Sequence, residues 1–308
     1  MNFKKNITGN KSKIAQCSFC HKAKNVKFIF ADRKFNFFFC FTCHMGFTYP
    51  YPKPKELEKY YHENYWVTPG LLGFFRKYVF DFFQTRRKRW VMHYLSKGKI
   101  LDVGAGEAKF AKSLGNRYQV TSLDVPSSKI INKSVLKVNF LKWQTSNRFD
   151  AIVFWESLEH TPKPEQYLQK AYKLLKKDGF MFIEYPRFDS FESRFFNKYW
   201  FHLDPPRHYS YITEKGLELL VSRTGLLRVF HGSVAAFEYA IWGFIGSTLN
   251  IINLRITDIL KQNRSLILLF LLIPFFIMVV FIEIFFAIIG QSPIGLMIAK
   301  KESKNLAP

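Results

Sequence analysis

The beginning of the chain lacks the apolar run of a secretory signal peptide. Its first residues are MNFKKNITGNKSKIAQ, a basic and polar stretch, so we expect the domain that follows to remain in the cytoplasm. Cysteine is also scarce, with 4 residues in a chain of 308. Because disulfides are unusual in a reducing compartment, these cysteines need a different explanation.

Acidic residues are few as well. The chain has 23 Asp and Glu against 46 Lys and Arg, which gives a formal net charge of +23. Such a charge favours acidic partners, among them nucleic acid, anionic lipid head groups and phosphorylated substrates. The charge by itself does not choose among these partners.

The four cysteines are arranged in two close pairs. Each pair has two residues between its members, and the pairs are Cys17 with Cys20 and Cys40 with Cys43. Two thiolates at this spacing bind one ion, and two such pairs complete the tetrahedral four-sulfur shell that Zn²⁺ prefers. The sequence therefore predicts an N-terminal zinc ribbon with a structural ion, in which His21 and His44 are not ligands.

A proline-rich linker and a basic helix follow the predicted ribbon. The string YPYPKP at residues 49–54 is incompatible with a regular helix or a central strand. Residues 74–95 then have a helical, aromatic and basic pattern that includes Arg86-Arg87-Lys88-Arg89. Two interpretations are open for this run, a solvated helix face and a contact with an anionic membrane or phosphate, and we favour the contact.

From residue 99 onward, apolar runs of strand length alternate with helical patterns, which predicts a doubly wound parallel sheet. Lys176-Lys177-Asp178-Gly179 is expected to end the helix before the fifth strand, with glycine in the left-handed conformation. Seven strands are predicted, near residues 99–103, 119–124, 135–138, 149–154, 180–184, 227–232 and 294–300.

The first of these strands enters a glycine turn in ILDVGAGEAKFAKSL, residues 100–114. Small residues at this position let the backbone approach a bound nucleotide closely. A dinucleotide fingerprint requires a third glycine at Lys109, and its absence argues against a nicotinamide cofactor. The D-x-G-x-G pattern of Asp102, Gly104 and Gly106 instead resembles the first motif of class I S-adenosylmethionine-dependent methyltransferases. In this resemblance Ala108 replaces the third glycine, a departure we expect to be mild because alanine is small.

The resemblance also implies roles for residues at the next strand ends. Asp124 ends the second strand, at the edge where ligands of open α/β sheets bind, and is expected to hold the two ribose hydroxyls. Asn139, after the third strand, is a weaker candidate for the adenine side. In this family the loop that corresponds to Glu156 lines the methionine end of the cofactor. The predicted cofactor site therefore consists of Asp102, Gly104, Ala105, Gly106, Asp124, Asn139 and Glu156.

The loop after the fourth strand has the sequence WESLEH, residues 155–160. Its E-x-x-E-H pattern is similar to the carboxylate and histidine arrangement of ubiquinone-biosynthesis O-methyltransferases, in which these residues can hold a divalent cation such as Mg²⁺. The same string also serves in related enzymes only to shape and cap the loop. We favour the second interpretation, with Glu156 lining the pocket.

The acceptor side is assigned to residues 200–213, WFHLDPPRHYSYIT, which present Arg207, His208 and Tyr209. A hydroxyl acceptor loses its proton as it attacks the methyl group, and histidine titrates near neutral pH. His208 is the first candidate for the base and His160 the second, with His202 a lesser one. The alternatives are a histidine that only hydrogen-bonds the loop, and catalysis mainly by alignment of the acceptor.

An apolar segment, residues 234–290, is predicted to be inserted between the sixth and seventh strands. Residues 266–289 are apolar except for Pro274 and Glu283, and about 20 such residues cross a bilayer. Two crossings would export the basic connection RITDILKQNR, against the positive-inside tendency. We therefore expect a monotopic or re-entrant hairpin on the cytoplasmic face of the membrane, the alternative being a buried helical pair or a dimer interface.

Together these motifs resemble a broad bacterial group of methyltransferases that is often encoded among cell-surface polysaccharide genes. The expected function is O-methylation of a lipid-linked or cell-surface glycan precursor, with S-adenosylmethionine as cofactor and membrane lipids as partners. Two alternatives remain, a quinone or prenyl-lipid O-methyltransferase and a non-catalytic zinc-ribbon scaffold that binds nucleic acid, although no specific nucleic acid is expected. The predicted domains are residues 1–50 (ribbon), 51–98 (linker and basic helix), 99–233 with 291–301 (methyltransferase), 234–290 (insertion) and 302–308 (tail).

Overall fold

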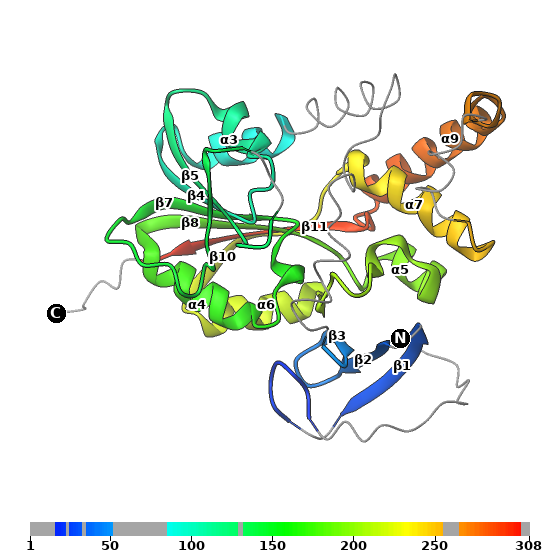
Figure 1. Ribbon diagram of the computed structural model, residues 1–308, viewed down its shortest axis with the longest axis horizontal. Helices are drawn as coiled ribbons and strands as arrows, with labels where there is room; N and C mark the ends of the chain where they lie inside the picture. The colour runs from blue at the N-terminus through cyan, green and yellow to red at the C-terminus, as the bar shows by residue number, and fades with distance from the viewer. Residues whose placement is uncertain are drawn as a thin grey trace.

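Figure 1 shows the computed structural model of the chain. Residues 1–15 of the predicted ribbon, residues 52–84 of the predicted linker and basic helix, the basic connection at residues 255–264 and most of the tail lie outside the part that the structure describes. The described residues are 16–22, 25–32, 35–51, 85–128, 132–254 and 265–302.

The main body is a seven-stranded mixed sheet with the order β10-β11-β8-β7-β4-β5-β6. The strands β8, β7, β4, β5 and β6 are parallel, whereas β11 runs antiparallel to both β8 and β10. The α/β fold class and the seven-stranded sheet predicted from the sequence are thus confirmed, but the prediction of a parallel sheet was wrong for β11. The strand bounds are β4 (Gly98–Val103), β5 (Tyr118–Asp124), β6 (Val135–Lys137), β7 (Phe149–Trp155), β8 (Leu175–Pro186), β10 (Leu226–Ser233) and β11 (Ile294–Lys301).

Alternate side chains of the central strands enter two separate cores. Leu101 and Ile152 belong to the core on one face, and Ile100 and Val153 to the core on the other. The first face is covered by α4 (Pro164–Leu174) and α6 (Glu214–Arg223), and the second by α3 (Lys109–Leu114) and the helical residues 85–94. This division follows from the two-residue period of a strand buried on both faces.

The end of α4 differs from the sequence prediction. The helix ends at Leu174, β8 begins at Leu175, and the residue with positive φ is Asp178 (61°) rather than Gly179. Gly179 is required for a different reason, because a Cβ there would lie 3.1 Å from the carbonyl oxygen of Asp150 on the neighbouring strand. The glycine permits close approach of two strands and does not end the helix.

A second, smaller sheet has the order β1-β2-β3-β9. Its first three strands are β1 (Val26–Asp32), β2 (Phe35–Cys40) and β3 (Met45–Tyr49), and they form an antiparallel meander. The fourth strand, β9 (Ser210–Tyr211), comes from the predicted acceptor loop and pairs antiparallel with β3. In Figure 1 this sheet lies below the large one, beside α5 (Phe191–Phe196) and α6.

Two further helices occupy the chain between β10 and β11. They are α7 (Phe237–Ile251) and α9 (Ser265–Ile288), which extend side by side away from the large sheet in Figure 1. Among the described residues, no helix combines the length and the apolar character that crossing a bilayer requires. Glu283, the carboxylate within the apolar run of α9, is 1% exposed and interacts with Glu192 of α5, and burial raises its pKa to about 7. Attachment of this region to a membrane stays a prediction.

Candidate active site and metal centre

The glycine turn after β4 is held against β5 by backbone hydrogen bonds. The N–H groups of Gly104 and Ala105 each donate to the carbonyl oxygen of Leu123 at 2.9 Å. Gly104 has a φ of 81°, and a Cβ on it would lie 2.5 Å from the Cβ of Ser157. At Gly106, with a φ of 52°, a Cβ would meet no atom within 4 Å. The turn therefore presents open space at Gly106, where a ligand can approach the backbone.

Ala108 departs from the family pattern more than its size indicates. Its φ is 54°, so it stands in the left-handed region at the N-terminus of α3. An L-residue there costs roughly 1–2 kcal/mol relative to its ordinary conformations. The expectation that the alanine is a mild substitution was wrong, because the constraint at this position is on the backbone rather than on volume.

The carboxylate of Asp124 lies across this turn. It accepts hydrogen bonds from the N–H of Gly106 at 2.9 Å and from the N–H of Val125 at 2.7 Å. Burial raises the pKa of Asp124, and these two backbone hydrogen bonds oppose the rise. Because a carboxylate oxygen accepts more than one hydrogen bond, Asp124 retains lone pairs for a ribose hydroxyl. Its binding role stays a prediction.

Asp102, at the end of β4, is buried with 1% exposure. Neither of its carboxyl oxygens has a hydrogen-bond partner in the described part of the chain, and burial raises its pKa to about 7. A buried carboxyl without a partner fits a ligand that brings a positive charge or a donor. Asn139 is different, since it is exposed and its side-chain oxygen accepts from the N–H of Lys142 at 3.2 Å. Its assignment to the adenine side stays a prediction.

Two glutamates follow β7 at the methionine end of the predicted cofactor site. Glu156 has a φ of 52° and donates its N–H to the carbonyl oxygen of Glu184 at 3.0 Å. Glu159 lies in the 3-10 helix η1 (Leu158–His160) and is 1% exposed. Oε1 of Glu156 and both carboxyl oxygens of Glu159 lack hydrogen-bond partners among the described residues. Burial raises the pKa of both groups, to about 8 for Glu159.

The two candidate bases contact each other. The rings of His160 and His208 are 4.5 Å apart and nearly perpendicular. Nδ1 of His160 lies 3.1 Å from the carbonyl oxygen of Arg207, and Nδ1 of His208 lies 2.8 Å from that of His202. Burial lowers the pKa of each ring to about 3, so both are neutral at physiological pH. His208 therefore carries its proton on Nδ1, directed at a carbonyl, and presents Nε2 as an acceptor.

The same cluster has the composition of a cation site. Ligand atoms of Glu159, His160 and His208 all lie within 4.8 Å of one another. This set differs from the one that the E-x-x-E-H string implies, because His208 is present in place of Glu156. Only the fold brings residues from these two loops together.

A buried ionic network beside the site was not anticipated. Arg86 donates to Glu184 at 2.5 Å and to Glu238 of α7 at 2.9 Å, and Nε of Arg87 donates to Glu184 at 2.8 Å. The Arg87 guanidinium also lies 5.3 Å from the ring of Trp155. The prediction that this basic run contacts a membrane or phosphate was wrong for these two arginines. A signal was present in the sequence, because a glutamate within the apolar strand FMFIEYP needs a buried cation.

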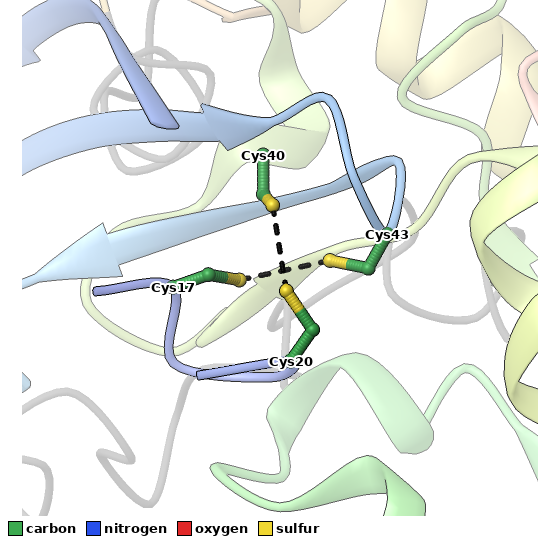
Figure 2. A group of neighbouring side chains, drawn as sticks. All are labelled: Cys17, Cys20, Cys40 and Cys43. Atoms are coloured by element: carbon green, nitrogen blue, oxygen red, sulfur yellow. Dashed lines mark hydrogen bonds between the residues drawn. The ribbon is translucent and has the colours of Figure 1, made fainter. Parts of the chain in front are cut away.

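The four cysteines converge on one point. Cys17 and Cys20 lie in the turn before β1, Cys40 ends β2, and Cys43 lies in the turn before β3. Figure 2 shows the four sulfur atoms directed toward a common centre, with Cys17 Sγ 3.6 Å from Cys43 Sγ and Cys20 Sγ 3.7 Å from Cys40 Sγ. All four thiols are free, and their sulfurs lie within 4.8 Å of one another.

This geometry fits a tetrahedral metal ion. Four sulfurs at about 2.3 Å from a zinc ion stand about 3.8 Å from one another, which agrees with the separations of 3.6 and 3.7 Å in this structure. His21 and His44 each follow the second cysteine of a pair with a φ of 55°, so the two turns have the same form. Neither histidine belongs to the cluster of ligand atoms. The identity of the ion as zinc stays a prediction.

A mixed seven-stranded α/β sheet, with an open glycine turn and a carboxylate at the next strand end, defines a class I S-adenosylmethionine-dependent methyltransferase. The chain belongs to the methyltransferase domain family, whose model matches residues 75–229, about half of the sequence. This membership supports an enzyme and disfavours the non-catalytic scaffold. The four cysteines lie outside the matched residues.

Among curated proteins, the chain is similar to ubiquinone biosynthesis O-methyltransferases. It is 27% identical over 143 residues to the protein from Rickettsia typhi, an alignment that covers 42% of this chain and 58% of that protein. The protein from Chromobacterium violaceum is 31% identical over 99 residues, which cover 28% of this chain and 43% of that protein. The chain therefore spans about half of the length of these relatives, 58% of the first and 43% of the second.

Solved structures with related folds include methyltransferases of several kinds. One is the 1,6-didemethyltoxoflavin-N1-methyltransferase of Burkholderia thailandensis, with a TM-score of 0.48, 13% identity, and coverage of 90% of this chain and 100% of that one. Another is a SAM-dependent methyltransferase from Archaeoglobus fulgidus, with a TM-score of 0.43, 16% identity, and coverage of 73% of this chain and 94% of that one.

Proposed function

We propose that this protein transfers the methyl group of S-adenosylmethionine to a sugar hydroxyl of a lipid-linked or cell-surface glycan precursor, at the cytoplasmic face of a membrane. The observation that carries the proposal is a set of three carboxyl oxygens without hydrogen-bond partners among the described residues, Oε1 of the half-buried Glu156 and both oxygens of the buried Glu159. Glu159 lies beside the two histidines on the acceptor side.

Leaving such groups without partners is costly. A buried polar atom without a hydrogen bond costs about 1–3 kcal/mol, so these carboxyl groups fit a ligand that supplies several hydrogen-bonding groups. Burial raises the pKa of both carboxyl groups, to about 8 for Glu159, so Glu159 is protonated at neutral pH and can both donate and accept a hydrogen bond. Adjacent hydroxyls of a sugar do the same. A flat apolar acceptor would leave most of these atoms unpaired.

The same arrangement indicates how the acceptor is activated. S-adenosylmethionine supplies the electrophilic methyl group when it is bound. Nε2 of His208 accepts a hydrogen bond from the attacking hydroxyl and orients one oxygen lone pair toward that methyl group. Because the pKa of His208 is lowered to about 3, the ring is a weak base. Alignment of the acceptor therefore contributes more to the rate than early removal of its proton.

An exposed apolar surface supports attachment to a membrane. We call it the apolar face, and it comprises exposed side chains of α5 and the described part of α9. Phe195 is 65% exposed and Phe281 is 67% exposed, and the ring of Phe191 lies 4.8 Å from that of Phe286, which joins the two helices. The apolar face consists of Phe191, Phe195, Phe276, Ile277, Met278, Phe281, Ile284, Phe285 and Ile288.

Cations next to the apolar face favour an anionic lipid surface as its occupant. Arg194 and Lys198 are exposed on and just after α5, in a chain of net charge +23. Apolar groups flanked by Lys and Arg are the usual composition of an interfacial membrane anchor. An acceptor that is itself anchored in lipid would then be held close to the site.

Vesicle flotation tests the membrane part of the proposal. The wild-type protein should float with vesicles that contain phosphatidylglycerol and much less with pure phosphatidylcholine. The double variant Phe281→Glu/Phe285→Glu should lose this binding, whereas Leu227→Glu, which changes an exposed apolar residue of β10, should retain it. Equal flotation of both variants would show that the apolar face does not bind the membrane.

Mass spectrometry of extracted glycolipids tests the acceptor. In cells that lack the gene, a glycolipid or polysaccharide precursor should lack one methyl group and be lighter by the mass of one CH₂ unit, because methylation replaces a hydrogen with CH₃. Purified protein should restore that methyl group from S-adenosylmethionine. An unchanged glycolipid profile would reject a glycan acceptor.

The rival function is methylation of a quinone or another prenyl lipid. It is favoured by the names of the curated relatives and by the Glu159, His160 and His208 cluster, which has the composition of a divalent cation site. This rival predicts methyl transfer to a polyprenyl catechol that requires Mg²⁺ and is abolished by Glu159→Gln. The control is to show that the thiolate-bound ion remains after divalent cations have been chelated. If methyl transfer is then unaffected, the result favours the glycan acceptor.

A further inference from the structure

The metal-binding module and the acceptor loop share one sheet. β3 belongs to the module and follows Cys43 directly, whereas β9 belongs to the loop that contains His208. The two strands pair antiparallel, with Gly46 opposite Tyr211 and Phe47 opposite Ser210. The module is therefore continuous by hydrogen bonding with the acceptor side of the site.

Thr48 of β3 makes the closest contacts with this loop. It is fully buried, and its N–H donates to the carbonyl oxygen of Tyr209 at 3.2 Å. Its Oγ1 lies 2.7 Å from the hydroxyl of Tyr211 and 3.4 Å from the carbonyl oxygen of His208. The Tyr211 hydroxyl donates in turn to the carbonyl oxygen of Leu203 at 3.1 Å. Thr48 thus holds the carbonyl group of Tyr209 directly and, through the hydroxyl of Tyr211, that of Leu203, with His208 between them.

The other side of the loop is fixed to the catalytic sheet. The N–H of Tyr209 donates to the carbonyl oxygen of Glu159 at 2.9 Å, and the ring of His160 is hydrogen-bonded to the carbonyl oxygen of Arg207. The His208 backbone is therefore held between Thr48 and η1. If either support is removed, the backbone of His208 is no longer held in place relative to Glu159 and His160.

The metal-binding turn is itself attached to the catalytic domain. The carbonyl oxygen of His44, next to Cys43, accepts a hydrogen bond of 2.6 Å from Oγ1 of Thr213. Thr213 is the N-cap of α6, and its Oγ1 also accepts from the N–H of Gly216. A Cβ on Gly216 would lie 2.6 Å from that same carbonyl oxygen, which explains the glycine.

We propose that the C-x2-C module is a positioning element for the methyl acceptor, with Thr48 as its positioning residue. The bound ion fixes the turn at Cys43 and hence β3, and β3 fixes His208 and Tyr209 through Thr48. The path does not pass through the glycine turn, where the N–H groups of Gly104 and Ala105 donate to Leu123 of β5 and that of Gly106 donates to Asp124. The inference rests on the acceptor-side role of His208 in the proposed function.

Hydrogen exchange of the full-length protein tests the inference without knowledge of the acceptor. Removal of the ion with a zinc chelator should raise exchange in residues 204–213 by about tenfold or more, and leave exchange in residues 98–124 unchanged. Affinity for S-adenosylhomocysteine, measured by calorimetry on the same samples, should change by less than about threefold, within the scatter of independent sites. Thr48→Val should reproduce this pattern while it retains about one zinc ion per chain.

Two matched variants separate positioning from a general loss of stability. Thr48→Ser keeps the hydroxyl and should restore wild-type exchange in the loop. Thr224→Val removes a comparably buried hydroxyl, which donates to the carbonyl oxygen of Val221 at 2.6 Å on α6, and should leave the loop unchanged. Loop exchange that is unaffected by zinc removal or by Thr48→Val would overturn the inference. So would a parallel loss of S-adenosylhomocysteine affinity, because the module would then support the whole domain.

Failure of the proposed function gives a different result. Glycolipids could be unchanged in cells lacking the gene while hydrogen exchange in residues 204–213 still increases on zinc removal and in Thr48→Val. The acceptor assignment would then fail, and the positioning of the loop by the C-x2-C module would stand.

Discussion

The glycine turn allows a paired prediction about folding stability. Gly104→Ala and Gly106→Ala both place an L-residue at a positive φ, of 81° and 52°, which costs roughly 1–2 kcal/mol. A part of this cost, about 0.4–1 kcal/mol, is offset because alanine reduces the entropy of the unfolded chain. Only Gly104 adds a clash, since its new Cβ would lie 2.5 Å from the Cβ of Ser157.

Ser157 cannot move away cheaply to relieve that clash. Its hydroxyl donates to the carbonyl oxygen of Val103 at 2.7 Å, and overpacking of a fixed site costs typically about 1–3 kcal/mol. We therefore expect Gly106→Ala to lower the free energy of unfolding by about 1 kcal/mol and Gly104→Ala by about 3 kcal/mol. Urea denaturation of the cofactor-free protein measures both values.

A double-mutant cycle with Ser157→Gly isolates the steric part. Removing the Ser157 Cβ should recover about 1–2 kcal/mol in the Gly104→Ala background. The same change should recover nothing in the Gly106→Ala background. Equal losses from the two alanine variants, or an absence of coupling between Gly104→Ala and Ser157→Gly, would refute the geometry of the turn.

Three further predictions concern the charged groups and the metal. Because the pKa of Asp102 is raised to about 7 in the cofactor-free protein, the affinity for S-adenosylmethionine should rise from pH 5 to 7 as the carboxylate ionises, and then level off; calorimetry should show that Asp102→Asn removes this dependence. Arg87→Met removes one of the cations that pair with the buried carboxylate of Glu184, and should lower the free energy of unfolding by about 3 kcal/mol in urea denaturation. The control Arg89→Met, at an exposed position, should change that free energy by less than about 0.5 kcal/mol. Freshly reduced protein should contain about one zinc ion per chain by elemental analysis, and Cys20→Ser should lose most of it; a full complement of zinc in that variant would contradict a four-sulfur site.

Periodic features were predictable from the sequence because they reflect local chemistry. The seven strands were located from apolar runs, and the convergence of the cysteines followed from their paired spacing. Features that depend on contacts between distant segments were not predictable. Glu184 within an apolar strand indicates that a buried cation is needed, but only the fold shows that Arg86 and Arg87 supply it and that Glu238 joins them.

Individual glycines and histidines show the same limit. Gly179 resembles a helix terminator, although its actual constraint is a strand that passes beside it. His160 and His208 are 48 positions apart, and their contact requires that η1 and the loop before β9 meet at one edge of the sheet. A sequence pattern identifies residue types for chemistry, but the partner of each residue is set by topology.

Calorimetric titration with S-adenosylhomocysteine tests the central claim, that the glycine turn and Asp124 form the cofactor site. The wild-type protein should bind about one equivalent, and Asp124→Ala should bind at least about tenfold more weakly, because a hydrogen bond to a charged group contributes roughly 1.5–3 kcal/mol. A wild-type protein that does not bind the nucleoside, or an Asp124→Ala variant with undiminished affinity, would contradict the account.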